Sequence, residues 1–218
     1  MDNILETGWE VTERLRSGEL SGAAIERVSL EGVDLGAPVL DHVRLSQCTF
    51  KGVSLSGMTA RDVHWTGCLL RGAVLTQALM FRTNFVSCRG LESCWDGALL
   101  EQVGFVETPL SNARMRGVQM HEVSFQASDL YGAQLQEAVL TRCVFSDPKM
   151  GAASLNRVNL SRALVTESDL SNAILYGADL RGTIFVGCDF RGAVLDGAQL
   201  EGSRFLHCQL DRPLAGAR

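Results

Sequence analysis

The sequence predicts an all-β fold in which the chain winds into stacked four-sided coils, closed at its start by a short helix. Three observations support this prediction. Every fifth residue from Leu20 to Leu210 is Leu, Ile, Val, Met, Phe or Trp, with Ala60 and Gly90 as the exceptions and no insertion or deletion. A small residue recurs two positions before each large one, and glycine often recurs two positions after it. Side chains twenty positions apart are alike.

The period of five defines the repeating unit. An amphipathic helix would repeat its apolar residues at three and four, and a single strand at two, so a strict five indicates a solenoid. The unit has the order small, polar, large apolar, polar, glycine, as in Ala178-Asp179-Leu180-Arg181-Gly182. One bulky and one small inward residue can fill a narrow interior. Glycine suits a corner, where the chain turns sharply.

The second period, of twenty, sets the number of sides. If four pentapeptides complete one coil, residues twenty apart stack, and six of the nine phenylalanines then fall in one column. We expect this column to form part of the core, with the members Trp65, Phe85, Phe105, Phe125, Phe145, Val165, Phe185 and Phe205.

The chain divides into three segments. Residues 1–18 are expected to form an N-terminal capping helix, and residues 19–211 the solenoid of about 9.5 coils. At ~4.8 Å per stacked strand, the solenoid would be about 46 Å long. Residues 212–218 form a short tail, too broken to cover much, so the last coil is a candidate contact surface.

The capping helix is predicted from apolar pairs at helical spacing. Leu5 and Trp9 lie four apart, as do Val11 and Leu15. Such a helix would cover the first coil, whose unpaired strand edge would otherwise invite aggregation.

The repeating units resemble those of the pentapeptide-repeat family, usually written A-(D/N)-L-x-x. The units that carry the resemblance are Ala178-Asp179-Leu180, Ser168-Asp169-Leu170, Ser128-Asp129-Leu130 and Cys188-Asp189-Phe190. The resemblance covers residues 19–211. It implies a right-handed quadrilateral parallel β-helix, in which the central and small residues point inward.

The seven cysteines have a structural interpretation. Six occupy the small inward position, where a free thiol behaves as a small hydrophobe. Their stacking geometry is poor for disulfides, and a reducing compartment is the natural one for them. Cys94, at an outward position beside Trp95, is the one plausible reactive thiol.

The remaining residue patterns do not indicate an enzyme. None of the four histidines has a second His or Cys at metal-ligand spacing, and the acids lie at outward positions of a convex rod. The glycines follow the five-residue frame instead of a phosphate-binding motif. We therefore expect no catalytic, cofactor-binding or metal-ligating residues, and no cofactor.

Charge and hydropathy limit the partners. The net charge of -5, without a run of Lys or Arg, excludes an electrostatic nucleic-acid binder. No apolar run approaches the ~20 residues that span a bilayer, and the first residues lack the features of a secretory signal. The expected location is cytoplasmic.

The wall that contains the phenylalanine column is expected to carry an apolar strip on its outer side. Large exposed apolar patches mark interaction sites, and a two-fold homodimer is the commonest solution. A complex with another protein is the alternative. The strip comprises Val144, Leu164 and Ile184 in one twenty-residue column, and Val86, Val106, Val186 and Leu206 in a neighbouring one.

These features favour a non-enzymatic protein-binding scaffold, and the family resemblance makes a bacterial, secretion-associated role plausible. The alternative, also implied by the resemblance, is a DNA-mimicking protein that interacts with DNA gyrase and confers quinolone-type resistance. Such mimicry needs a sustained negative field. The outward residues mix both signs instead, for example Asp41 and Glu101 with Arg61 and Arg181 on one wall. No residue specifies the partner or the pathway.

Three positions depart from the repeat. Gly90 replaces a large central residue, and Pro109 and Pro148 interrupt the local pattern. A bulge or slight kink is the favoured interpretation, and a small dent recognised by a partner is the other.

Overall fold

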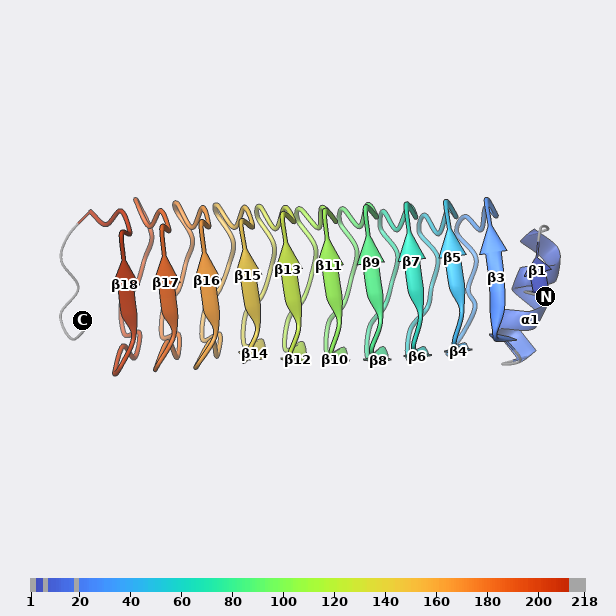
Figure 1. Ribbon diagram of the computed structural model, residues 1–218, viewed down its shortest axis with the longest axis horizontal. Coiled ribbons are helices and arrows are strands. Elements are labelled where there is room, and N and C mark those ends of the chain that lie inside the picture. The colour runs from blue at the N-terminus through green and yellow to red at the C-terminus, as the bar shows by residue number, and fades with distance from the viewer. Residues whose placement is uncertain (1–2, 6–7, 18–19, 212–218) are drawn as a thin grey trace.

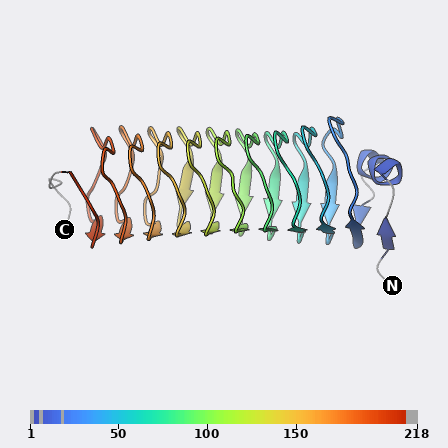
Figure 2. The ribbon, with the colours of Figure 1, turned by 90° about the horizontal axis from the view of Figure 1, so that it is seen from above.

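The chain forms a straight rod of stacked coils (Figure 1). The computed structural model describes residues 3–5, 8–17 and 20–211. Helix α1 (Gly8–Ser17) lies at one end of the rod, beside β1 (Asn3–Leu5), and the coils follow from residue 20 onward (Figures 1 and 2). No helix in the described part of the chain has the length and apolar character to span a bilayer.

One wall of the rod is a parallel sheet of eleven strands, which we call sheet A. Its strands stack in chain order along the whole rod (Figure 1). After β1 they are β3 (Ala23–Glu26), β5 (Arg44–Ser46), β7 (His64–Thr66), β9 (Asn84–Val86), β11 (Gly104–Val106), β13 (Ser124–Gln126), β15 (Val144–Ser146), β16 (Leu164–Thr166), β17 (Ile184–Val186) and β18 (Arg204–Leu206).

The wall before it in each coil is sheet B, a parallel sheet of seven strands. Beyond β14 this wall continues as isolated bridges, and the two remaining walls are formed by isolated bridges throughout. The strands of sheet B are β2 (Leu20–Ser21), β4 (Val39–Asp41), β6 (Thr59–Arg61), β8 (Leu79–Phe81), β10 (Leu99–Glu101), β12 (Gln119–His121) and β14 (Val139–Thr141).

The register confirms the twenty-residue coil. Phe85 pairs with Phe105, and Phe105 with Phe125, so equivalent residues of successive coils lie directly above one another. The rings of Phe105 and Phe125 stack at 4.8 Å between centroids, and those of Phe125 and Phe145 at 5.0 Å. The central and small residues of nearly every coil are buried, which leaves the positions between them exposed.

The corners use a left-handed backbone more widely than their glycines suggest. Gly52, Gly72 and Gly182 have φ between 64° and 67°. Many other corners carry a non-glycine residue in the same region, such as Ala127 with φ 48° and Ala152 with φ 54°. The coil geometry imposes this conformation even on residues that ordinarily avoid it.

The N-terminal cap differs from the expected helix over residues 1–18. The helix begins at Gly8, and residues 3–5 form a strand that adds to sheet A by pairing with β3. Val11 and Leu15 are buried in the core, as their spacing predicts. The pairing of Leu5 with Trp9 was wrong, because Leu5 lies outside the helix and Trp9 is 76% exposed. A strand satisfies the edge of the first coil with hydrogen bonds that a helix cannot supply.

The predicted bulge at Gly90 is absent, and the register continues through it. The amide of Gly90 donates to Pro109 O at 2.9 Å, in step with the coils on either side. Other side chains occupy the space beside Gly90, where an added Cβ would lie 2.7 Å from Leu110 Cδ2 and 3.3 Å from Ser93 Oγ. The large ring of Trp95 is fully buried on the next wall, and its Nε1 donates to Ser93 Oγ at 2.7 Å. Ser93 Oγ in turn donates to Gly90 O at 2.5 Å.

The two prolines have different consequences. Pro148 is buried at the small position, and its neighbour Lys149 keeps the bridges to Asp129 and Asp169. At Pro109 the described bridges of this wall are interrupted, because proline has no N–H to donate. Neither produces a bulge, and the coil spacing is kept. Residues 212–218, the expected tail, lie outside the described residues.

The small inward residues that follow the strands of sheet A also serve as hydrogen-bond donors. The Cys68 thiol donates to Leu45 O at 3.5 Å, and the Cys88 thiol to Trp65 O at 3.4 Å. In the next coils hydroxyls take the same place, with Thr108 Oγ1 donating to Phe85 O and Ser128 Oγ to Phe105 O, each at 3.2 Å. Cysteine, threonine and serine therefore exchange at this position because each is small and satisfies a buried carbonyl.

Candidate interaction surface

Sheet A positions two outward residues per coil, one on each side of its buried central residue. Because alternate residues of a strand point to opposite faces, the first and third residue of each strand reach the outer side. The twenty-residue register then stacks them into two columns. The first runs through Val144, Leu164 and Ile184, and the second through Thr166 and Val186.

Seven consecutive strands of sheet A carry no Asp, Glu, Lys or Arg at these outward positions. We call this region the uncharged face. On the other three walls, the same stretch of the rod has charged residues of both signs. The uncharged face consists of His64, Thr66, Asn84, Val86, Gly104, Val106, Ser124, Gln126, Val144, Ser146, Leu164, Thr166, Ile184 and Val186.

The apolar part of this face is concentrated in its C-terminal half. Val144 is 39% exposed and Leu164 36% exposed, and they pair directly in neighbouring strands. Ile184 and Val186 of β17 are partly exposed, and Val186 pairs with the partly exposed Leu206 of β18. The structure thus brings all five candidate interface residues onto adjacent strands.

The expected apolar strip is not continuous along the rod. Val86 and Val106 stack on each other, but three polar residues separate them from Val186 in the same column. Gly104, beside Val106, is buried, and a Cβ added there would lie 2.6 Å from Asn84 Oδ1. The two valines therefore form a separate, smaller patch.

Charged corner residues border the uncharged face on both sides. On the side where the chain enters β15 and β16, Arg142 and Arg162 are exposed. On the side where it leaves, Asp147 and Glu167 are exposed. All four have left-handed backbones, with φ between 49° and 61°. None of these side chains has a hydrogen-bond or ion-pair partner among the residues that the structure describes.

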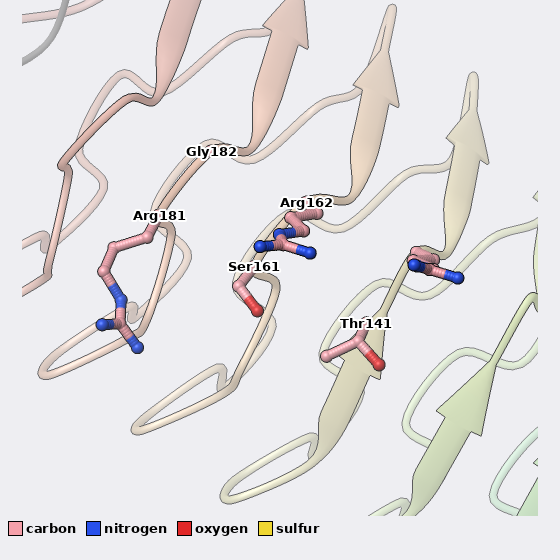
Figure 3. Close-up of a pocket in the computed structure, with 6 residues that line it drawn as sticks. Thr141, Ser161, Arg162, Arg181 and Gly182 are labelled. Atoms are coloured by element: carbon pink, nitrogen blue, oxygen red, sulfur yellow. The ribbon is translucent and has the colours of Figure 1, made fainter.

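The two arginines border an open depression of about 570 Å³ (Figure 3). Arg181, also on its wall, is held by Asp179, whose carboxylate lies 2.6 Å from Arg181 Nη2. Figure 3 shows Arg162 and Arg181 reaching out from neighbouring coils, with the hydroxyl of Ser161 between them. The depression is therefore positively charged at its sheet A side.

In other coils of this border and on the other walls, charges pair between stacked coils. Arg82 Nη2 lies 2.6 Å from Asp62 Oδ2, and this bond holds the pKa of Asp62 below its usual range. Arg114 and Asp96 pair at 2.5 Å. Such pairs neutralise one another along the rod, so these walls carry no sustained field of one sign.

Six of the seven cysteine thiols have raised pKa values. The exception is Cys88, whose pKa is lowered by a hydrogen bond with Cys68, but its side chain is fully buried. Burial raises the pKa of the Cys143 thiol to about 12 and that of Cys188 to about 11. Cys94, the one candidate for a reactive thiol, is only 8% exposed, and burial raises its pKa as well. Although Cys94 stands at an outward position, it is covered, which favours the structural interpretation of the cysteines. All seven cysteines are free.

The described residues contain no group of three or more His, Cys, Asp or Glu side chains that could hold a metal ion. His42 lies near acids, with Nδ1 3.1 Å from Asp41 Oδ1, on the exposed surface of a corner. Such an exposed contact differs from a buried catalytic dyad, which needs a partly desolvated site.

Sequence reasoning missed a second apolar region, on sheet B. Leu79 is 41% exposed and Val139 38% exposed. Leu99 and Val139 help to line a depression of about 220 Å³ on this wall, together with Glu101 and His121. The signal that could have revealed it was a twenty-residue column of mostly apolar residues, as on sheet A. Here the polar residue Gln119 interrupts the column, and the neighbouring column carries charged residues such as Glu101.

Comparisons with known proteins agree with the repeat found in the sequence. The family model described as pentapeptide repeats (8 copies) matches residues 108–147, 153–192 and 173–211. No curated protein has a matching sequence.

Among solved structures, HetL, a pentapeptide repeat protein involved in heterocyst differentiation regulation from the cyanobacterium Nostoc sp. strain PCC 7120, is 22% identical. The match covers 89% of this chain and 95% of HetL, with a TM-score of 0.46. QnrB1, a plasmid-mediated fluoroquinolone resistance protein, is 18% identical over 87% of this chain and 94% of QnrB1, with a TM-score of 0.46. The matched repeats and the twenty-residue coil together show that the chain belongs to the pentapeptide-repeat family.

Proposed function

We propose that this protein is a non-enzymatic binding scaffold, and that the uncharged face of sheet A is its protein-binding surface. One observation carries the proposal: seven consecutive strands present outward side chains without a single Asp, Glu, Lys or Arg. Depletion of charge at the centre and retention of charge at the rim is the composition of a protein interface. The corner residues Arg142, Arg162, Asp147 and Glu167 supply such a rim.

The affinity is expected to come from the apolar cluster at the C-terminal end of this face. Val144, Leu164 and Ile184 lie one above another on adjacent strands, so a partner can cover them with one continuous surface. Removing this exposed apolar area from water favours association in proportion to the area covered. The rigid stacked backbone holds the three side chains in place, which limits the ordering cost of binding.

The test places a charge within the cluster and compares it with the same change on another wall. Leu164→Asp puts a carboxylate in the middle of the cluster, whereas Ile174→Asp changes an apolar residue that is 41% exposed on a different wall. Association, with itself in sedimentation velocity or with host proteins in affinity capture, should weaken at least about tenfold for Leu164→Asp. Ile174→Asp should associate like the wild type. Equal behaviour of the two variants would contradict the proposal.

The gyrase-directed alternative requires a wall of sustained negative charge, and the ion pairs between coils do not favour it. A supercoiling assay with and without a quinolone tests it directly. We expect micromolar protein to leave both the supercoiling activity and its inhibition unchanged. Protection of gyrase would replace the proposed scaffold function with DNA mimicry.

A further inference from the structure

We propose that the uncharged face joins two copies of this chain side by side, with the rods parallel and the two-fold axis running along their length. The inference rests on the proposed function, since it takes the same face as the binding surface. It adds the identity of the occupant, a second copy, and the orientation in which that copy binds.

The first argument is the unequal charge of the two borders. The entering border has Arg142 and Arg162, and the leaving border has Asp147 and Glu167, in the same two coils. All four side chains are exposed, and none has a partner within the described chain. In these two coils the face is therefore positive along its entering edge and negative along its leaving edge, with Leu164 and its apolar neighbours between them.

In a two-fold dimer, this charge difference between the borders determines the relative direction of the two rods. When two copies meet face to face about an axis along the rods, the entering border of one copy lies against the leaving border of the other. Coils of equal number lie side by side, so Arg142 faces Asp147 of the second copy, and Arg162 faces Glu167. The symmetry repeats both pairs on the opposite edge.

The antiparallel alternative, with the two-fold axis across the rods, brings like borders together. Arginines would then face arginines, and acids would face acids. Like charges at an interface disfavour the wrong arrangement strongly, while rim pairs of opposite sign set orientation and association rate more than affinity. The distribution of these four charges therefore selects the parallel arrangement.

The apolar residues also find suitable neighbours in the parallel arrangement. The axis places the first outward column of one copy against the second column of the other. Leu164 then packs on Thr166 of the second copy, and Ile184 on Val186. No charged residue of either uncharged face is buried, so the contact carries no unpaired charge at its centre.

The straightness and length of the rod set the strength of the contact. Sheet A runs along a nearly straight axis, so two copies can touch along its whole length (Figure 1). Seven coils at ~4.8 Å, and a width of five residues at ~3.3 Å, make a face of about 34 by 16 Å, or roughly 550 Å² per copy. The sum for two copies is about 1,100 Å², just below the usual range of stable interfaces. We expect a reversible dimer that forms at micromolar concentration.

The experiment is a charge-swap complementation on the full chain. One variant carries Arg142→Glu and Arg162→Glu, and the other carries Asp147→Arg and Glu167→Arg. Each alone should dimerise at least about tenfold more weakly than the wild type, because like charges then face each other on both edges. An equimolar mixture should regain wild-type affinity, because every edge of the mixed dimer again pairs opposite charges. Sedimentation equilibrium measures all four samples, and circular dichroism confirms that each variant is folded.

The outcomes separate this inference from the proposed function. A wild type that stays monomeric at several hundred micromolar would overturn the second copy as the occupant. A dimer that is insensitive to both swaps, or variants that the mixture does not rescue, would overturn the parallel arrangement. In either case, the comparison of Leu164→Asp with Ile174→Asp for binding to host proteins still tests the scaffold function by itself.

Discussion

Restoring a large residue at Gly90 is the sharpest test of how the interior is packed. The repeat itself favours leucine there, because nearly every other central position is large and apolar. The structure indicates the opposite outcome. A Cβ at Gly90 would lie 2.7 Å from Leu110 Cδ2 and 3.3 Å from Ser93 Oγ, and a leucine adds three more carbons to the same space. The variant Gly90→Leu should therefore be less stable than the wild type.

The magnitude follows from the cost of overpacking a dense core, typically about 1–3 kcal/mol. For a chain of this size, about 2 kcal/mol corresponds to a fall in Tm of about 4–8 °C. Differential scanning calorimetry of the two proteins under one set of conditions measures the shift. An unchanged or higher Tm for Gly90→Leu would refute the packing argument.

A second variant identifies the cause. Trp95→Leu alone removes the edge contacts of the indole with Phe85 and Phe105, whose centroids lie 5.5 and 5.7 Å away, and leaves a cavity. It should also destabilise the protein, by about 2–4 kcal/mol. If Trp95 occupies the volume that Gly90 leaves open, the double variant should lose less than the sum of the two, by at least about 1 kcal/mol. Additive losses would show that the two sites are independent.

Two further predictions concern titrating groups. The hydrogen bond from Arg181 holds the pKa of Asp179 below its usual value, and a hydrogen bond from Arg191 lowers the pKa of Asp189 in the same way. Because the folded-state pKa values are lowered, their contribution to stability is present above the unfolded pKa of about 3.9 and is lost as the pH falls through the lower folded values. Thermal unfolding from pH 5 to pH 2 should show a fall in Tm that is smaller in Asp179→Asn, and an equal fall would contradict this. Burial keeps thiols such as Cys143 protonated, so a thiol reagent at pH 8 should label the native protein far more slowly than the denatured one, and rapid labelling of Cys94 would contradict the structure.

Much of the architecture could be predicted because the repeat is local and gapless. A bulky residue every five positions and an aromatic residue every twenty leave few ways to bury the apolar side chains, and stacking identical coils is the simplest. Phe105 and Phe125 are therefore neighbours in the rod as they are neighbours in the frame. The outward columns follow by the same logic, which is why Val144, Leu164 and Ile184 could be placed together beforehand.

The features that the sequence did not predict share one cause: they depend on side-chain volumes and on contacts between different walls of the rod. Leu110 and Ser93 take the space beside Gly90, and Cys94 is covered although it stands at an outward position of the repeat. The first residues form a strand because the edge of sheet A is available to them, which no helical spacing reveals. Which corner charges lack a partner depends on the side chains of the neighbouring coils, and the sequence does not show how those side chains are oriented.

The sequence by itself determined the four-sided coil, the inward columns and the wall that carries the apolar residues, because periodic patterns report which side chains share an environment. The tertiary structure alone decided how the N-terminal end of the solenoid is closed, which side chains fill the space beside Gly90, and which charged side chains have no partner among the described residues. These properties arise from distances between residues of different walls and coils, and a linear pattern does not contain those distances.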